Sequence, residues 1–447
     1  MFKFGQPGTI YSHAEWSERV RMLAPGRELQ RHRNHKNRGR AFLIAVVLIF
    51  LVFNCRSLNV SSPSHLLAFP HRISRLHYLV PANVPNLQVC AVVTSALANQ
   101  YSIPTILGYR GESFLDAQKA HIAKLRAIKD YLHNARGASD DLVIIVDGFD
   151  VLAQLPAEAM IQRYFTLKAE ADQRLADRRG ITVKELHRTG VRHTLLWGTD
   201  KGCWSESETD PRCWLVPFSA QPRLTWGLKT DTGDLQYNDS RFLNSGTVIG
   251  PLGDLRKFLD AALSLIEDDW DQNFLFRDSD QFYIAALYKR QEYQRMPDFS
   301  GGNFPGDIAG RDVPRPKGGK DDVTEYHITV DLDYTFTQTE CHNYSLRLGT
   351  NIGPRVIFAF YHNTCDKAGF LDTFHDAWFY PLIRPLLRAA VRAIQHQHPI
   401  NAESFDGRIW VAARQYPKRD LDEYGGVLYG CTRGGVHTTA GILQGVY

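Results

Sequence analysis

Two carboxylates directly follow a strongly apolar run, at a spacing that lets both reach one divalent cation. Asp147 and Asp150 come immediately after the segment 141–146 (DLVIIV). Acids three residues apart at a strand end can share a hard cation, and a cation held there can neutralise a diphosphate. A solvated turn explains the same residues, because Asp-Gly is a common turn dipeptide. The acidic pair alone therefore leaves both interpretations open.

A histidine elsewhere in the chain is a candidate third ligand. His362 follows the apolar segment 356–361 (VIFAFY). A lone histidine in such a place is more often structural than ligating. Its place at the end of another predicted strand nevertheless makes a metal site of Asp147, Asp150 and His362 plausible.

Two polar stretches are candidates for contact with a sugar. The segment 241–250 (RFLNSGTVIG) pairs a small polar loop around Asn244 with a strand, which lets backbone and amide groups approach a ligand closely. Asp278 and Asp280 precede the helical segment 282–287. Helix capping explains these acids equally well, because Ser and Asp are preferred N-cap residues.

Short apolar runs that alternate with helical patterns position these residues. The alternation is typical of an α/β domain with a mainly parallel sheet flanked by helices. In such sheets ligands lie beyond the carboxyl ends of the strands, where both acids and the histidine are expected. Strands are predicted at 87–94, 104–107, 141–146, 194–198 and 356–361, and helices at 116–132 and 157–165.

The N-terminal region has the pattern of a membrane anchor. A basic stretch at 27–40 precedes thirteen consecutive apolar residues at 41–53. This predicts a single-pass type II protein with its catalytic domain in the lumen of the endoplasmic reticulum or Golgi. A cleaved signal peptide is the alternative, but the preamble is long for one and no small-residue cleavage site follows. The predicted ranges are a cytosolic tail (1–40), an anchor (41–55), a stem (56–86), a catalytic domain (87–395) and a C-terminal extension of unknown role (396–447), in which 408–411 can add a strand.

Composition supports a folded lumenal domain. The 447 residues are 44% hydrophobic and 22% charged, and the basic N-terminal run accounts for most of the net charge of +4. No lysine and arginine stripe beyond it suggests nucleic acid as a partner. Six of the seven cysteines follow the anchor, an even number suited to an oxidising compartment, and Cys203 with Cys213 is the expected disulfide. Cys90, inside an apolar run, is expected to be a buried thiol. Sequons at Asn59, Asn238 and Asn343 are compatible with a glycoprotein.

The order of these motifs resembles the glycosyltransferase domain of the lysyl hydroxylase and procollagen glycosyltransferase group. That family has an Asp-x-x-Asp strand end, a Cys-Trp segment, Leu-Asn-Ser-Gly, an acidic run with Asp-Gln, a Leu-Asp stretch, and a final strand ending in histidine. The resemblance spans about 87–367. Here the motifs are VDGFDV at 146–151, Cys203-Trp204, Leu243 to Gly246, Asp278 to Gln281, Leu332-Asp333 with Phe336 and Gln338, and His362.

The resemblance implies a GT-A type fold that uses a UDP-sugar and Mn²⁺, probable retention of configuration, and a protein or glycan acceptor. Asp147, Asp150 and His362 match the family's metal-binding positions. Asp280, Asp278 and Asn244 match positions on the sugar side and are the catalytic candidates. Thr94 on the first strand, Phe149 in place of the usual tyrosine, and Trp204 match positions around the nucleotide and the sugar. Lys119, near the start of the first helix, is a further candidate to face the nucleotide.

The sequence departs from the family pattern in ways that keep rival functions open. The glycine-rich segment after the histidine is replaced by 363–367 (NTCDK), where Lys367 can still supply positive charge to a diphosphate. A lumenal binding or scaffold protein that has lost turnover is therefore the alternative. A two-metal hydrolase is less favoured, because too few additional His and Asp ligands lie near the predicted strand ends.

Overall fold

The computed structural model divides the chain into two units, Met1–Phe69 and Pro70–Tyr447, and all described residues belong to the second. The predicted anchor at 41–55 and Lys119 lie outside the described residues. Among the residues that the structure describes, no helix has the length and apolar character needed to cross a membrane. The described ranges are 72–84, 86–108, 121–204, 210–219, 227–229, 237–295, 324–339, 357–364, 367, 369–400 and 408–413.

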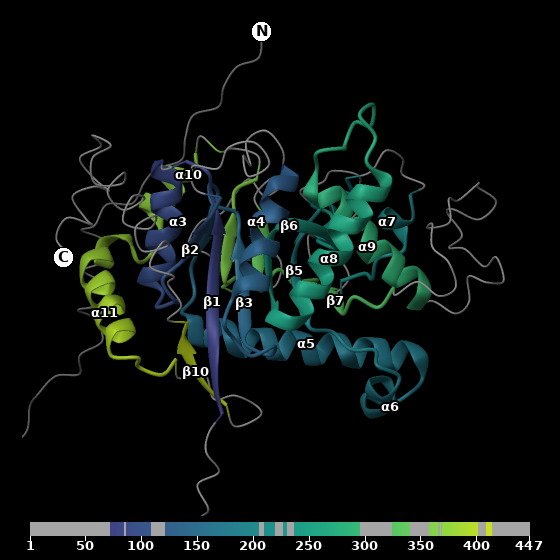
Figure 1. The fold of residues 1–447 in the computed structure, drawn as a ribbon, viewed down its shortest axis with the longest axis horizontal. Helices are drawn as coiled ribbons and strands as arrows, with labels where there is room; N and C mark the ends of the chain where they lie inside the picture. The colour runs from purple at the N-terminus through teal and green to yellow at the C-terminus, as the bar shows by residue number, and fades with distance from the viewer. Residues whose placement is uncertain are drawn as a thin grey trace, which may run out of the picture. The chain divides into compact units, whose positions relative to one another are not determined.

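The second unit is built on a seven-stranded central sheet (Figure 1). Its order is β10-β1-β3-β6-β5-β7, and β2 also pairs with β1. Four of its six strand pairings are parallel, and only β6 runs antiparallel to its neighbours β3 and β5. The predicted α/β class with a mainly parallel sheet is therefore confirmed. The strands are β1 (Ile73–Pro81), β2 (Thr105–Leu107), β3 (Leu142–Val146), β5 (Leu195–Asp200), β6 (Phe242–Pro251), β7 (Ile328–Val330) and β10 (Ile409–Ala412).

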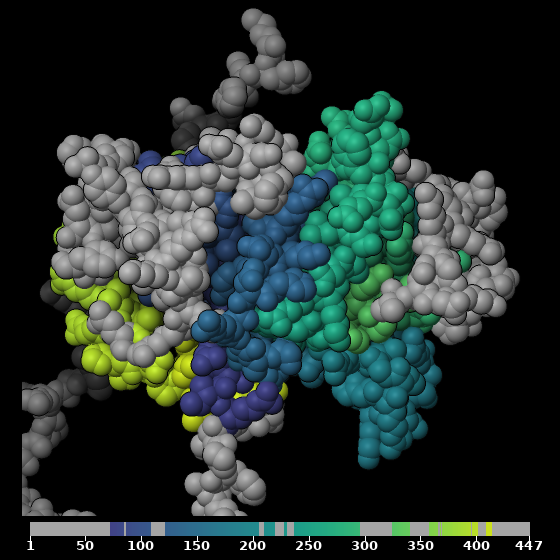
Figure 2. Space-filling view, in the orientation of Figure 1, coloured from purple at the N-terminus to yellow at the C-terminus, as the bar shows by residue number. Residues whose placement is uncertain are grey.

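Helices cover both faces of this sheet. Along β3 the side chains alternate between two apolar clusters, which explains why every residue of its LVIIV sequence is buried. One cluster contains side chains of α3, α5, α10 and α11, and the other those of α4, α8 and α9. In Figure 2 the surface of α4 adjoins that of α8 and α9. The helices are α3 (Leu87–Ala98), α4 (His121–Asn134), α5 (Ala157–Arg179), α6 (Val183–Arg188), α7 (Pro211–Trp214), α8 (Leu252–Asp269), α9 (Asp280–Arg295), α10 (Phe370–Asp376) and α11 (Ile383–Gln395), with 3₁₀ turns at Gly227–Lys229 and Tyr380–Leu382.

The strand predicted at 87–94 is wrong, because these residues form the first part of α3. The Asn86 side chain caps this helix by accepting a hydrogen bond from the Val89 N–H. All but the first two residues of α3 are buried, and periodicity alone cannot tell such a segment from a buried strand. The first strand of the sheet is instead β1, which lies within the range 56–86 predicted as a stem. Cys90, on α3, is disulfide-bonded rather than a free thiol.

A small second sheet brings distant parts of the chain together. Its order is β4 (Val151–Ala153), β9 (Phe360–His362) and β8 (Thr337–Thr339). The antiparallel register of β4 and β9 pairs Val151 with His362. Since Asp150 directly precedes Val151, this register sets the predicted histidine beside the predicted acids.

The C-terminal part of the chain contributes to the same domain. β10 pairs in parallel with the first half of β1, along Ile73–Leu76. Trp410, in β10, is fully buried in the apolar cluster that includes α3 and α11. The strand predicted near 408–411 is thus confirmed, and it belongs to the central sheet.

Candidate active site

The two carboxylates lie on the tight connection between β3 and β4. Asp147 follows the last residue of β3, and its N–H donates to the Gly246 carbonyl oxygen on β6 at 2.9 Å. Gly148 is packed so closely against the end of β1 that a Cβ there would overlap the Pro81 carbonyl oxygen. Glycine is therefore required at this position, and the backbone around both acids is fixed by neighbouring strands.

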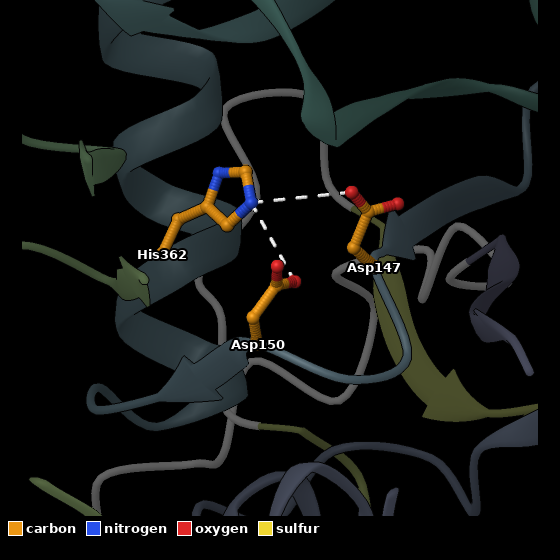
Figure 3. A group of neighbouring side chains, drawn as sticks. All are labelled: Asp147, Asp150 and His362. Atoms are coloured by element: carbon orange, nitrogen blue, oxygen red, sulfur yellow. Dashed lines mark ion pairs between the residues drawn. The ribbon is translucent and has the colours of Figure 1, made fainter. Parts of the chain in front are cut away.

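His362 completes a group of three potential metal ligands (Figure 3). Its Nε2 lies 3.6 Å from Asp150 Oδ1 and 3.9 Å from Asp147 Oδ2. The histidine ring lies against Gly246, where a Cβ would overlap the ring atom Cε1. The glycine of the Leu-Asn-Ser-Gly segment thus makes the room that the imidazole occupies.

The donor atoms of this group fit one divalent cation. One ligand atom from each residue lies within 4.8 Å of the others. Two ligands of an ion with metal–ligand distances of about 2.1 Å are at most about 4.2 Å apart, so both histidine–carboxylate distances are compatible with a shared ion. Asp150 Oδ1 is buried and has no hydrogen-bond partner among the described residues, as expected for an atom whose partner is a cation. The predicted convergence of the three residues is confirmed.

A lysine contacts the remaining oxygen of each carboxylate. Lys367 Nζ lies 3.2 Å from Asp150 Oδ2, and Lys124 Nζ lies 2.8 Å from Asp147 Oδ1. Burial opposes ionisation of Asp150, but His362 and Lys367 outweigh it and hold the pKa of this carboxyl below its usual range. Each acid therefore keeps one oxygen for the cation site and pairs the other with an ammonium group.

Lys124 also connects the metal group to Asp280. Its Nζ lies 2.5 Å from Asp280 Oδ2, and His121 Nδ1 lies 3.5 Å from Asp280 Oδ1. Burial would raise the pKa of the Asp280 carboxyl, but Lys124 and His121 lower it well below the usual range. Asp280 is therefore an anion whose two oxygens face an ammonium group and an imidazole.

Sequence reasoning missed Lys124 and His121, although a signal was present. Both residues lie in the first turn of α4, which follows β2 and precedes β3. In a parallel arrangement, the helix that follows a strand begins near the carboxyl ends of the strands, where ligands bind. Polar residues at the start of α4 were therefore candidates for the edge of the sheet that carries Asp147.

Two other sugar-side candidates differ in their placement. Asn244 is buried in β6, where its Oδ1 accepts a hydrogen bond from the Gly246 N–H at 2.8 Å. The Ser245 N–H points to the side chain of Gln281, the residue after Asp280, at 3.4 Å. Asp278, by contrast, is half exposed and lies 3.4 Å from Arg277. Asn244 thus lies next to the residues of β6 that border the site. Asp278 instead forms an ion pair with Arg277, its neighbour in sequence.

Trp204 lies on a segment held by a disulfide. Cys203 and Cys213 are bonded, as predicted, and Trp204 is 52% exposed. Trp204 and Gln281 line the same small pocket, together with Leu243 of β6. The indole is therefore near the start of α9, where Asp280 faces the metal group.

Of the two remaining predicted contacts, Thr94 lies on an element other than the one predicted, and Phe149 lies between the two acids. Thr94 was expected on the first strand, but it lies in the middle of α3, fully buried, with its hydroxyl unpaired among the described residues. Phe149, on the connection between the two acids, packs partly buried against the apolar cluster of α3 and α5.

The similarity to known proteins is distant. No family model matches the chain. Over 172 residues it is 22% identical to the multifunctional procollagen lysine hydroxylase and glycosyltransferase of Caenorhabditis elegans. The match covers 38% of this chain and 16% of that protein's length. Together with the Asp-Asp-His group, it supports a glycosyltransferase-like relationship.

Proposed function

We propose that this chain is a metal-dependent glycosyltransferase that moves a hexose from a UDP-sugar to a protein or glycan acceptor. The observation that carries the proposal is the approach of Asp147 and Asp150 to His362 at the junction of the two sheets. The distant similarity to a protein named as a glycosyltransferase supports it. A GT-A type fold and Mn²⁺ as the cation are parts of the same proposal.

The residues of the site suit the stabilisation of a departing diphosphate. A bound divalent cation acts as a Lewis acid on the phosphate oxygens. Asp147, Asp150 and His362 would hold it, which requires ionised carboxylates and a neutral imidazole. Counting Asp280, Lys124 and Lys367 as well, three carboxylates face two ammonium groups, so with neutral imidazoles the group has a formal charge of −1. A divalent cation changes this to +1, which favours an anionic nucleotide.

In the transfer itself, the bond between the anomeric carbon and the UDP oxygen breaks, and UDP leaves with the electron pair. A bond forms to an acceptor hydroxyl oxygen, whose proton is released. Asp280 stays ionised beside Lys124 and His121, so it stabilises positive charge on the sugar or positions the donor rather than accepting a proton. Retention of configuration, with Asn244 and Asp278 near the sugar, is proposed from the family resemblance.

The cellular setting is proposed from the sequence. A cytosolic tail, an anchor at 41–55 and a lumenal catalytic domain in the endoplasmic reticulum or Golgi suit an enzyme that uses a UDP-sugar. The disulfide between Cys203 and Cys213 is consistent with an oxidising lumen.

A lumenal binding protein without turnover is the second candidate. One observation favours it: each of the two carboxylates is paired with a lysine, which balances its charge. In such a protein the Asp-Asp-His group would be a remnant, neutralised by side chains.

Release of UDP from a panel of UDP-sugars, with and without Mn²⁺, tests the proposal. We expect Mn²⁺-dependent release from one donor and its loss in Asp147→Ala. The matched control is Asp260→Ala, which removes an exposed aspartate that contacts α4 at Lys129 and His133. No release from any donor, combined with no binding of UDP, would leave the binding protein as the better description.

A further inference from the structure

Lys124 is a buried lysine placed between two acids with different roles. Its side chain is only 10% exposed, and its Nζ contacts Asp147 at 2.8 Å and Asp280 at 2.5 Å. The Ser245 carbonyl oxygen of β6 lies 3.4 Å from the same nitrogen. The ammonium group therefore joins α4, α9, β6 and the connection after β3 at one point.

This lysine remains charged in the folded protein. Its Nζ contacts two carboxylates, those of Asp147 and Asp280, and the two contacts hold the ammonium group in its charged form. A fixed positive charge thus contacts one oxygen of Asp147, whose other oxygen faces His362. A divalent cation bound by that second oxygen would lie close to the ammonium group and be repelled by it.

Lys367 does not have the same effect, although it pairs with the other carboxylate. Its side chain is 59% exposed, so water and salt screen its charge and it can move away when a cation arrives. Lys124 has no such freedom, because it is buried and Asp280 also contacts its ammonium group. The two lysines therefore act differently on an incoming ion.

We propose that Lys124 is a built-in counter-cation that weakens the binding of a free divalent cation and strengthens the binding of a cation together with a diphosphate. This inference rests on the proposed function and gives Lys124 a role separate from that of the metal ligands. Without nucleotide, the lysine balances Asp147. With nucleotide, the lysine and the cation both face the added negative charge, so the two ligands bind cooperatively.

Lys124→Met tests this with equilibrium binding. Removing a buried positive charge a few ångströms from a bound ion changes its affinity by about tenfold or more. For the full chain, we expect Mn²⁺ alone to bind about tenfold more tightly in Lys124→Met than in the wild type. At saturating Mn²⁺, UDP should bind about tenfold more weakly. Lys124→Arg keeps the charge and should restore both affinities towards those of the wild type.

The matched control is Lys129→Met on the same helix. Lys129 forms a similar pair with Asp260, at 2.9 Å, but both side chains are about 40% exposed. This variant should bind Mn²⁺ and UDP within about twofold of the wild type, because exposed pairs are screened. Titration calorimetry for UDP and electron paramagnetic resonance for free Mn²⁺ measure the two affinities separately.

The outcomes separate this inference from the proposed function. Wild-type protein that binds neither Mn²⁺ nor UDP contradicts both. Wild-type binding with unchanged or weaker Mn²⁺ affinity in folded Lys124→Met overturns the counter-cation alone. If unpaired Asp280 prevents folding, Lys124→Met combined with Asp280→Asn removes both charges of the pair. In this double variant Asp147 no longer pairs with Lys124, so Mn²⁺ should again bind more tightly than in the wild type. An unchanged Mn²⁺ affinity refutes the inference.

Discussion

Replacement of Asp150 by asparagine separates metal binding from stability. Asp150→Asn keeps the volume of a buried side chain and removes its charge. The oxygen that faces His362 at 3.6 Å has no hydrogen bond from any residue that the structure describes, so the change acts on the atom expected to contact the ion. Loss of an outer partner of a metal ligand already costs 10–100-fold in affinity. We expect loss of the ligand charge to weaken Mn²⁺ binding at least about 100-fold, or about 2.7 kcal/mol.

The stability of the metal-free protein should change little. The other oxygen of Asp150 pairs with Lys367, which is largely exposed, and such a pair contributes at most about 1 kcal/mol. In the wild type, Mn²⁺ at about 100 times its dissociation constant adds about 2.7 kcal/mol to the free energy of unfolding. This corresponds to a rise in Tm of about 4 °C for a large domain. Asp150→Asn should show no such rise.

Thermal melts with and without Mn²⁺, together with direct titration of Mn²⁺, measure both effects. Asp260→Asn serves as the control, since Asp260 is 43% exposed and pairs with Lys129 away from the proposed ligands. The reasoning is refuted if Asp150→Asn melts well below the wild type without metal yet gains the same stabilisation from Mn²⁺. That result would make Asp150 a structural residue and not a ligand.

Three further changes test the site and the stability of the domain. Gly246→Ala should turn the His362 ring aside because of the overlap at Cε1, lowering Mn²⁺ affinity at least about tenfold in a titration while circular dichroism stays native. Cys203→Ser opens the loop to Cys213, ten residues away, and should lower the free energy of unfolding by about 2–3 kcal/mol in urea melts; an unchanged midpoint would contradict this. Burial opposes ionisation of Glu325, but its hydrogen bonds and charged neighbours lower its pKa to about 2. Ionised Glu325 therefore contributes roughly 3 kcal/mol to the free energy of unfolding above about pH 4.3, and this contribution is lost as the pH falls towards 2. Glu325→Gln should shift the midpoint of acid unfolding to a higher pH.

The site was largely predictable because its ligands end buried strands. The LVIIV sequence of β3 has no polar residue, so its end, and the acids that follow it, are clear from the sequence. His362 was found by the same argument. Lys124 was missed because its role depends on how α4 packs against α9. Its place in the first turn of α4 marks it as a candidate, but its acidic partners come from distant parts of the chain.

The errors in the fold have identifiable causes. β1 has the sequence ISRLHYLVP, in which buried Ser74 and His77 interrupt the apolar pattern of a strand. His77 is accommodated by a contact between its Nδ1 and the Tyr131 hydroxyl at 2.9 Å, which only the tertiary structure supplies. The valine-rich 87–94 segment has the composition of a strand, but it forms the first part of a helix whose residues are almost all buried in the apolar cluster. Local propensity therefore failed where burial from several sides decided the outcome.

The return of β10 to the sheet sets practical limits on fragments for crystallisation. A fragment that stops at residue 395, the predicted end of the catalytic domain, would lack Trp410 and leave Ile73–Leu76 of β1 with an open edge. Such an edge is a template for aggregation. Soluble expression should therefore require a fragment from about residue 70 to at least residue 413, and a purification tag is better attached beyond those ends than at the apparent boundaries of the catalytic motifs.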